Sequence, residues 1–309
     1  MRDGVAPTVT VVRACLRDGA GGSPTAVLPE TGLSDRERRA VPALLGTSHA
    51  VFVSLAPAGP VSADVSLRFF TTTGELPACG HGTVAALAYL AAPRETTGGH
   101  GDALGPADHS PVTLRTPGRV FTGRVGRVGR EFRAAFDPGP VTVREPAPDE
   151  TVPVLRALGL DADPLAVDAH VATLGRPRLL VPVSARSVLA GLAPDLDRLR
   201  VACDRLGLLG CYVYHGPTAD GRVPGDSRRG RVAARMFAPS IGVPEDIANA
   251  NSTACLAAHL ARAGTTDLTV DMGDALGVPA SISTTVRDGD SGPLVEVGGA
   301  AVVDRVVHP

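Results

Sequence analysis

A repeated element in the two halves of this 309-residue chain constrains its fold more than any other feature. Residues 68–91 read "RFFTTTGELPACGHGTVAALAYLA", and residues 235–261 read "RMFAPSIGVPEDIANANSTACLAAHLA". Each segment contains Arg-x-Phe, a turn, an acidic residue, a short run of small or polar residues, and then an apolar helical pattern. The chain length is itself typical of about two domains. The repeat therefore predicts two related domains, each with a carboxylate beside the start of a helix.

The apolar pattern predicts more strands than helices. Short or alternating apolar runs bounded by Gly, Pro and Asp indicate strands near 8–15, 49–55, 64–70, 119–124, 131–136, 178–182, 210–215, 231–237, 267–271, 279–285 and 294–303. Helical periodicity indicates helices over 34–45, 83–92, 150–159, 193–206 and 253–263. Because strands and helices do not alternate regularly, an α+β fold is favoured over a doubly wound sheet. The segment 92–111, rich in Gly, Pro and polar residues, is the predicted linker.

The composition excludes several classes of function. The chain has no lysine, so all 30 basic residues are arginines. Pyridoxal phosphate enzymes, class I aldolases and P-loop proteins, which all need a lysine, are therefore excluded. A formal charge of -2 from interspersed residues and only 3% aromatic residues argue against a nucleic acid partner. Since there is no signal-peptide pattern and no apolar run of membrane-spanning length, we expect a cytoplasmic protein without a membrane partner.

Cysteine and histidine spacing gives no sign of a metal or a disulfide framework. The five cysteines are scattered without a CxxC pair and should be free thiols: Cys15, Cys79, Cys203, Cys211 and Cys255. The eight histidines form no HExxH motif, so a histidine metal site would have to be assembled from distant segments. The sequence predicts no metal and no cofactor.

The small and polar residues before each repeated helix suit an anion site. A helix start carries unpaired N–H groups and a partial positive charge, and small residues let a ligand approach the backbone. We therefore expect a substrate carboxylate to be bound by Cys79, Gly80, His81 and Gly82 of "CGHGT" and by Asn249, Ala250, Asn251 and Ser252 of "NANST". The alternative is an ordinary capped helix start in each half, with Thr83 and either Ser252 or Thr253 as caps.

These segments resemble the PhzF-like family of phenazine-biosynthesis-type isomerases, relatives of diaminopimelate epimerase. The counterparts of the family motifs are "GSPTAV" (22–27), "SHAVFV" (48–53), "FTTTGELPACGHGT" (70–83), "RMFAPSIGVPED" (235–246) and "EVGGAAVV" (296–303). The chain departs from the family at three places. His49 stands where the family usually has Glu, Ser23 replaces Asn, and "EDIANA" replaces the family's E-D-P-x-T-G.

The resemblance implies two similar domains, each a curved antiparallel sheet or half-barrel around a central helix, with the active site in the cleft between them. The N-terminal domain would span 1–108, with the last strand, 296–309, returning to it. The C-terminal domain would span 109–295. The resemblance also implies a homodimer.

The resemblance further implies a cofactor-independent isomerase with Glu75 as general acid/base and Asp246 as a second carboxylate. Such an enzyme would shift a proton and a double bond in a small, carboxylate-bearing, amino-acid-derived metabolite of a specialised biosynthetic pathway. Glu75 would then need a pKa well above its ordinary value of about 4.3, which apolar surroundings such as Leu76 and Pro77 would provide.

Two other functions are compatible with the same residues. The related epimerases use two cysteines as an acid/base pair, and Cys79 could serve as one of them. Its counterpart in the other half, Asn249, cannot transfer a proton, which disfavours this chemistry. The other alternative is a non-catalytic protein of the same fold that binds a small acid.

Overall fold

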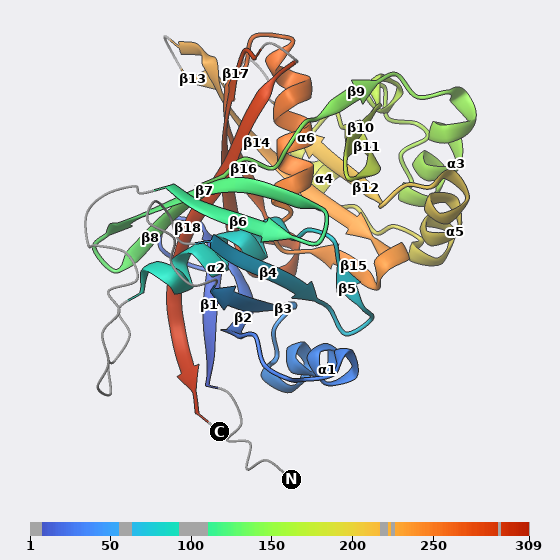
Figure 1. Cartoon of the computed structure of the whole chain (residues 1–309). Coiled ribbons are helices and arrows are strands. Elements are labelled where there is room, and N and C mark those ends of the chain that lie inside the picture. Colours follow the sequence, from blue (N-terminus) through green and yellow to red (C-terminus); the bar gives the residue numbers. More distant parts are fainter. Residues whose placement is uncertain are drawn as a thin grey trace. The chain divides into compact units, whose positions relative to one another are not determined.

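The computed structural model describes residues 8–55, 64–92, 111–216, 222–223, 226–289 and 292–308 (Figure 1). The contacts within the chain divide it into two compact units. Unit 1 comprises Met1–Asp137 and Gly298–Pro309, and unit 2 comprises Pro138–Val297. Almost all of the predicted linker lies outside the described residues. The sequence placed the boundary after residue 108, whereas residues 111–136 belong to unit 1 because they continue its sheet.

The described residues of unit 1 form two helices, with strands before, between and after them. The elements are β1 (Val9–Leu16), β2 (Ser23–Pro29), α1 (Asp35–Leu45), β3 (His49–Leu55), β4 (Asp64–Phe70), β5 (Glu75–Leu76), α2 (Gly80–Ala91), β6 (Pro111–Thr116), β7 (Arg119–Val128), β8 (Glu131–Phe136) and the later part of β18 (Leu294–Val307).

The strands of unit 1 form a closed ring of pairings around α2. β1 pairs with β2, β2 with β3, β3 with β4, β4 with β6, β6 with β7 and β7 with β8. β8 then pairs with β18, and β18 pairs antiparallel with β1. Closing a sheet in this way leaves no free edge on the paired strands.

Helix α2 fills the inside of this ring. Its sequence, GHGTVAALAYLA, has no polar face, and a helix that is apolar all round is a buried helix. It contacts β1, β2, β3, β4, β7 and β8. Small residues permit this packing: a Cβ on Gly123 of β7 would lie only 3.0 Å from Leu87 Cδ1. A larger residue where β7 passes α2 would force the side chains of Leu87 and Leu114 to shift.

Unit 2 contains the remaining elements. They are β9 (Thr142–Arg144), α3 (Pro148–Leu158), η1 (Ala166–Asp168), β10 (His170–Leu174), β11 (Arg176–Pro182), α4 (Arg186–Ala190), α5 (Leu196–Leu206), β12 (Cys211–His215), β13 (Arg222–Val223), β14 (Asp226–Ala238), η3 (Pro239–Ile241), β15 (Val243–Asp246), α6 (Ala250–Ala261), β16 (Asp267–Met272), η4 (Asp274–Leu276) and β17 (Ala280–Arg287).

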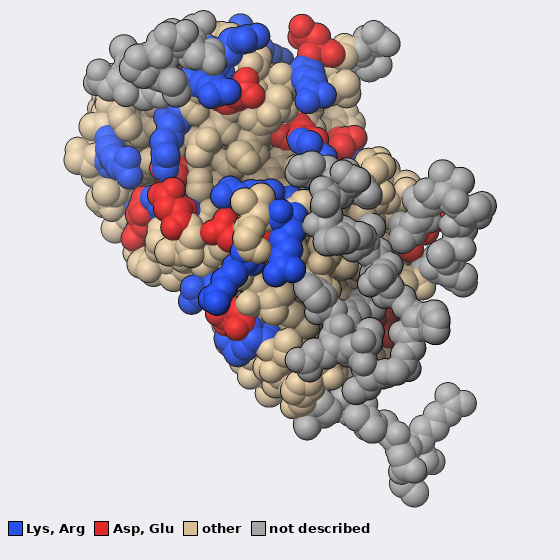
Figure 2. Space-filling view, turned by 90° about the vertical axis from the view of Figure 1, so that its left-hand side faces the viewer, with Lys and Arg blue, Asp and Glu red and all other residues tan. Residues whose placement is uncertain are grey.

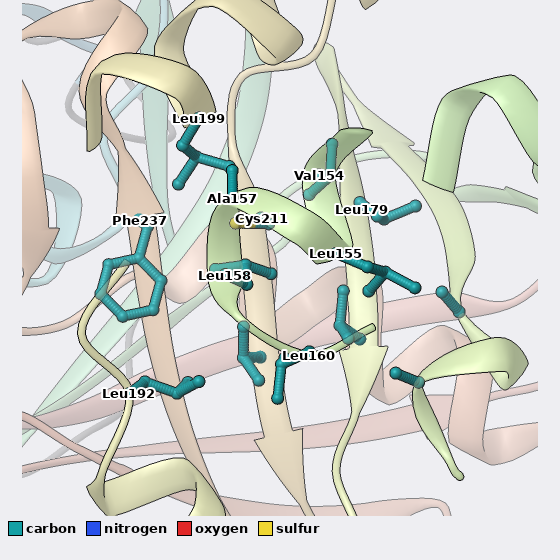
Figure 3. Close-up of a cluster of buried hydrophobic side chains, with 14 of the residues drawn as sticks. Val154, Leu155, Ala157, Leu158, Leu160, Leu179, Leu192, Leu199, Cys211 and Phe237 are labelled. Atoms are coloured by element: carbon teal, nitrogen blue, oxygen red, sulfur yellow. The ribbon is translucent and has the colours of Figure 1, made fainter. Parts of the chain in front are cut away.

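The sheet of unit 2 packs against different helices on its two faces. Leu179, Cys211 and Phe237, from β11, β12 and β14, point into an apolar cluster with α3 and α5 (Figure 3). The neighbouring Tyr212 points to the opposite face, where its hydroxyl lies 2.7 Å from Thr253 Oγ1 of α6. This alternation is the period of two expected for strands covered on both faces.

The two units share the same order of strand pairings. In unit 1, β1–β2 is antiparallel, β2–β3 parallel, β3–β4 antiparallel, β4–β6 parallel and β6–β7 antiparallel. In unit 2 the same sequence of directions runs through β10–β11, β11–β12, β12–β14, β14–β16 and β16–β17. In each unit a short strand and the 12-residue apolar helix lie between the fourth and fifth of these strands. The sequence repeat is therefore also a repeat of topology.

Most predicted elements lie where the sequence placed them, and the fold class is α+β as predicted. The apolar patterns missed several short elements, and they started two helices three residues too late. The missed elements are β2, β5, β6, β9, β10, β13, β15 and α4. Helices α2 and α6 begin at Gly80 and Ala250, three residues before the predicted starts. Thr83 and Thr253 are therefore not caps. Each donates its hydroxyl to the carbonyl of the residue before the helix, at 2.9 and 3.0 Å.

A half-buried histidine on α6 makes unit 2 sensitive to acid. The ring of His259 lies against that of His170 of β10, with ring centroids 4.2 Å apart and the planes tilted by 43°. Burial first, and then the charges of His170 and Arg262, lower the pKa of His259 to about 4 from an ordinary 6.5. Between about pH 6.5 and pH 4 the unfolded chain therefore binds a proton that the folded chain does not.

We expect the free energy of unfolding to fall as the pH drops through that window. His259 should account for about 1–2 kcal/mol of the fall, allowing for solvent screening at its partly exposed ring. Urea unfolding of the wild type and of His259→Gln near neutral pH and near pH 4.5 measures this. The variant should lose less stability than the wild type, and equal losses would contradict the prediction.

The surface carries charges of both signs. On the face shown in Figure 2, arginines and carboxylates lie intermixed, in keeping with the near-neutral formal charge. Among the described residues, no helix is long and apolar enough to cross a membrane.

Candidate active site

The start of α2 lies directly after a short strand that carries Glu75. Cys79 is the N-cap residue, with extended backbone angles and no side-chain bond to the helix. Gly80, His81 and Gly82 form the buried first turn. A Cβ on Gly82 would lie 3.0 Å from Cys79 Sγ and 3.1 Å from Phe69 Cδ1, so glycine lets this turn press against the sheet.

Three side chains meet beside this turn. His81 Nε2 lies 2.9 Å from Nδ1 of His49, the first residue of β3. Cys79 Sγ lies 3.5 Å from the same His81 nitrogen. His49, Cys79 and His81 are only 3%, 6% and 2% exposed. We call these three residues the His49–Cys79–His81 cluster.

His49 is uncharged near neutral pH. Burial first, and then the nearby His81, lower the pKa of His49 well below its usual value of 6.5. In the 2.9 Å contact between the two rings, one ring nitrogen donates its N–H to the lone pair of the other.

Glu75 lies outside this cluster and has different surroundings from those predicted. Its two carboxylate oxygens accept hydrogen bonds from Nε and Nη2 of Arg68, both at 2.8 Å. Arg68 also donates to Asp35 of α1 at 3.2 Å, and its guanidinium lies over the ring of Phe70. The side chain of Glu75 is 30% exposed. The predicted apolar surroundings are therefore wrong: the carboxylate is paired and partly in water.

The pairing also changes Arg68. Its hydrogen bond to Glu75 is the largest cause that raises the pKa of Arg68 above its ordinary value of 12.5, and Asp35 adds to the effect. A bidentate guanidinium pair fixes both the position and the plane of the carboxylate. Glu75 is thus held in one orientation just before α2.

The start of α6 is capped, unlike the start of α2. The side-chain oxygen of Asn249 accepts from the backbone N–H of Ser252 at 2.9 Å. The amide nitrogen of Asn249 donates to Asp246 Oδ2 at 3.0 Å, and Ala248 N–H donates to Asp246 Oδ1 at 3.3 Å. Asp246 is buried, whereas Glu75 is exposed. Asp246 therefore shapes the turn that leads into α6.

The structural counterpart of Glu75 is Glu245, not Asp246. Arg235 of β14 makes a bidentate pair with Glu245 of β15, at 2.9 and 2.7 Å, as Arg68 of β4 does with Glu75 of β5. Each glutamate lies five residues before the first residue of its helix. The sequence analysis selected Asp246 as the carboxylate of the second half. Asp246 directly follows Glu245, and unit 2 has an extra turn, η3, between Arg235 and Glu245 that obscures the alignment.

The structure groups the predicted site residues into two sets, one in each unit. In unit 1, Glu75 and the residues 79–82 lie together at the start of α2. In unit 2, Asp246 and the residues 249–252 lie together at the start of α6. The sequence analysis named His49 only as a departure from the family and did not place it in the site. The signal for placing it there was that the family usually has an ionisable residue, Glu, at this position.

The arrangement in unit 1 supports proton transfer. It offers a fixed carboxylate, a hydrogen-bonded imidazole pair and a thiol, which are the common acid/base groups of enzymes. The uncapped first turn of α2 adds backbone N–H groups that suit a negative charge.

Comparison with known proteins identifies the family of this chain. The family model for phenazine biosynthesis-like proteins, PhzC-PhzF, matches residues 14–306. A protein of Escherichia coli K12 named as an uncharacterized isomerase, YddE, is 27% identical over 294 residues, which cover 92% of this chain and 91% of that protein.

Solved structures show the same fold. A phenazine biosynthesis protein of the PhzF family from Bacillus anthracis has a TM-score of 0.77 at 17% identity and covers 98% of both chains. A protein from Pseudomonas aeruginosa described as a predicted epimerase has a TM-score of 0.77 at 24% identity, with 98% and 99% coverage. The resemblance stated from the motifs is confirmed. Because the family model spans nearly the whole sequence, this chain belongs to the phenazine biosynthesis-like PhzC-PhzF family.

Proposed function

We propose that the protein is an isomerase that moves a proton within a small metabolite carrying a carboxylate, with Glu75 as general acid/base. Membership of the family and a relative named as an isomerase support the reaction class. The position of Glu75 is the observation that supports its role as the general acid/base. An exposed carboxylate is fixed by two hydrogen bonds five residues before the start of a buried helix.

The ion pair with Arg68 is compatible with reversible protonation of the Glu75 carboxylate during a proton transfer. As a carboxylate, Glu75 can accept a proton from carbon. Protonation then weakens both charge-assisted hydrogen bonds to Arg68, which favours return of the proton to another carbon of the same substrate. The result is a shifted double bond without an electron carrier or an organic cofactor.

The start of α2 is the proposed anchor for the substrate carboxylate. Cys79 makes no capping bond, and the N–H dipoles of the first turn act at a buried position where their effect is strong. At the start of α6 the cap of Asn249 takes up the N–H of Ser252. Asp246 and Asn249 instead offer oxygen acceptors, which suit a cationic group better than an anion.

Solvent exchange tests the proposal directly. The protein is incubated in deuterium oxide with a panel of small unsaturated amino and hydroxy acids, in the presence of a chelator, and the products are read by NMR. We expect deuterium at a new carbon together with a moved double bond in at least one substrate. A protein that binds such acids without any exchange would be the non-catalytic alternative and would contradict the proposal.

An epimerase that uses Cys79 is the second candidate, and one contact favours it. The thiol lies 3.5 Å from His81 Nε2, and an imidazole at this distance can take the thiol proton. The equivalent cap in unit 2 is Asn249, which has no such chemistry. Exchange confined to an α-carbon, and lost in Cys79→Ser, would identify this reaction instead.

A further inference from the structure

The His49–Cys79–His81 cluster has a second property that proton transfer does not require. Its three donor atoms, His49 Nδ1, Cys79 Sγ and His81 Nε2, all lie within 4.8 Å of one another. They come from two segments 32 residues apart, the start of β3 and the start of α2. All three side chains are more than nine-tenths buried. Three buried donors thus converge on one small volume.

The distances are close to those around a tetrahedral metal ion. Bonds of about 2.0–2.1 Å to nitrogen and about 2.3 Å to sulfur place two nitrogen ligands about 3.3 Å apart and a nitrogen and a sulfur ligand about 3.5 Å apart. The observed separations are 2.9 Å between the two nitrogens and 3.5 Å between His81 Nε2 and the sulfur. The two imidazoles need to separate by about 0.4 Å to reach this geometry. The donor atoms of the third pair, His49 and Cys79, lie within 4.8 Å of each other.

The geometry points to a site for one borderline-soft divalent cation, with Zn²⁺ as the best match, held by His49, Cys79 and His81. Two imidazoles and a thiolate select zinc or cobalt over magnesium and calcium, which prefer oxygen ligands. Three protein ligands leave one coordination position for water or a small ligand.

Binding has a defined proton balance. The thiol of Cys79 loses its proton to solvent when the metal–sulfur bond forms. The proton that His49 and His81 share moves to a ring nitrogen that does not bind the metal, so neither ring changes its charge. One proton per ion is released.

This inference goes beyond the proposed isomerase reaction and differs from the sequence prediction of no metal. That prediction rested on the absence of metal-binding motifs such as CxxC and HExxH in the sequence. The cluster, in contrast, is brought together by tertiary packing and has no such motif. A simple hydrogen-bonded imidazole pair is the competing interpretation. The neighbouring rings of His170 and His259 in unit 2 provide a comparison, because among the described residues no thiol joins those two rings in a metal-binding group.

The test uses the full chain after removal of metals by a chelator. Titration with Co²⁺ should give one ion per chain, with the visible bands of tetrahedral cobalt and a thiolate-to-cobalt charge-transfer band in the near ultraviolet. Zn²⁺ should displace the cobalt. X-ray absorption of the zinc form should show one sulfur at about 2.3 Å and nitrogen at about 2.0 Å.

Variants identify the ligands. Cys79→Ser should remove the charge-transfer band. His49→Gln should weaken metal binding by more than about 100-fold, which exceeds the loss typical of a residue that only hydrogen-bonds to a metal ligand. His170→Gln and Cys255→Ser, changed in unit 2, should bind as the wild type does. Because the absorption spectrum needs only the wild type, a variant that fails to fold leaves the test intact. No bound cobalt, a zinc site without sulfur, or equal loss in the unit 2 variants would overturn the inference.

Discussion

Replacing Glu75 with glutamine is expected to lower the rate of solvent deuterium exchange by about 10²–10⁴-fold, the usual contribution of a general acid/base. Glutamine keeps the size of the side chain and one oxygen that accepts from Arg68, but it cannot take a proton from carbon. The rate is measured by NMR on the substrate that exchanges with the wild type. Circular dichroism and the melting temperature establish that the variant is folded.

A matched control separates proton transfer from the ion pair. Asp35 also accepts a hydrogen bond from Arg68, but it lies on α1 and is 60% exposed. Asp35→Asn removes a carboxylate from the same guanidinium and should leave the exchange rate within a few fold of the wild type. If Glu75→Gln retains wild-type exchange, or if both variants lose it equally, Glu75 only positions the turn before α2.

Loss of Arg235 is expected to destabilise the protein by about 3–5 kcal/mol, the cost of leaving one partner of a buried ion pair uncompensated. The side chains of Arg235 and Glu245 are only 11% and 10% exposed. Arg235 also donates to the carbonyl oxygens of Leu189 in α4 and of Leu192 just after it, at 3.0 and 2.9 Å. Arg235→Ala therefore removes the guanidinium from the Glu245 carboxylate and one hydrogen bond from each of these carbonyls. Urea unfolding measures the change.

The corresponding variant in unit 1 provides the contrast. Arg68 and Glu75 make the same bidentate pair, but their side chains are 32% and 30% exposed. Arg68→Ala should cost only about 0–1 kcal/mol, because water replaces the lost bonds. Equal losses of stability in the two variants would show that burial does not decide the strength of these pairs.

The fold was predictable wherever local sequence and tertiary packing agree. Helices α2 and α6 are apolar on all sides, and the strands rich in Val and Phe carry a clear alternation. β2 reads as a turn, because "SPTAVLP" begins with Ser-Pro and ends with Pro. It is a strand because β1 and β3 pair with it on both sides. Such long-range pairing leaves no local signal.

The candidate site was predictable only in part for the same reason. Glu75 and the residues of the α2 start form one continuous motif, so the sequence displays them together. His49 joins them through the packing of β3 against α2, which spacing along the chain does not show. Glu245 was missed because Asp246 follows it directly and either acid fits the pattern. Only the bonds to Arg235 distinguish them.

The pairing of β1 with β18 sets an order of events during synthesis. Val9 lies opposite Val307, so β1 is synthesised well before its partner β18. Residues 138–297 of unit 2 lie between the two parts of unit 1, so they leave the ribosome before unit 1 is complete. Nascent chains thus carry β1 and β8 as exposed edges until β18 emerges, and exposed edges invite aggregation. A chaperone that acts on this protein would therefore have to protect β1 for the longest time.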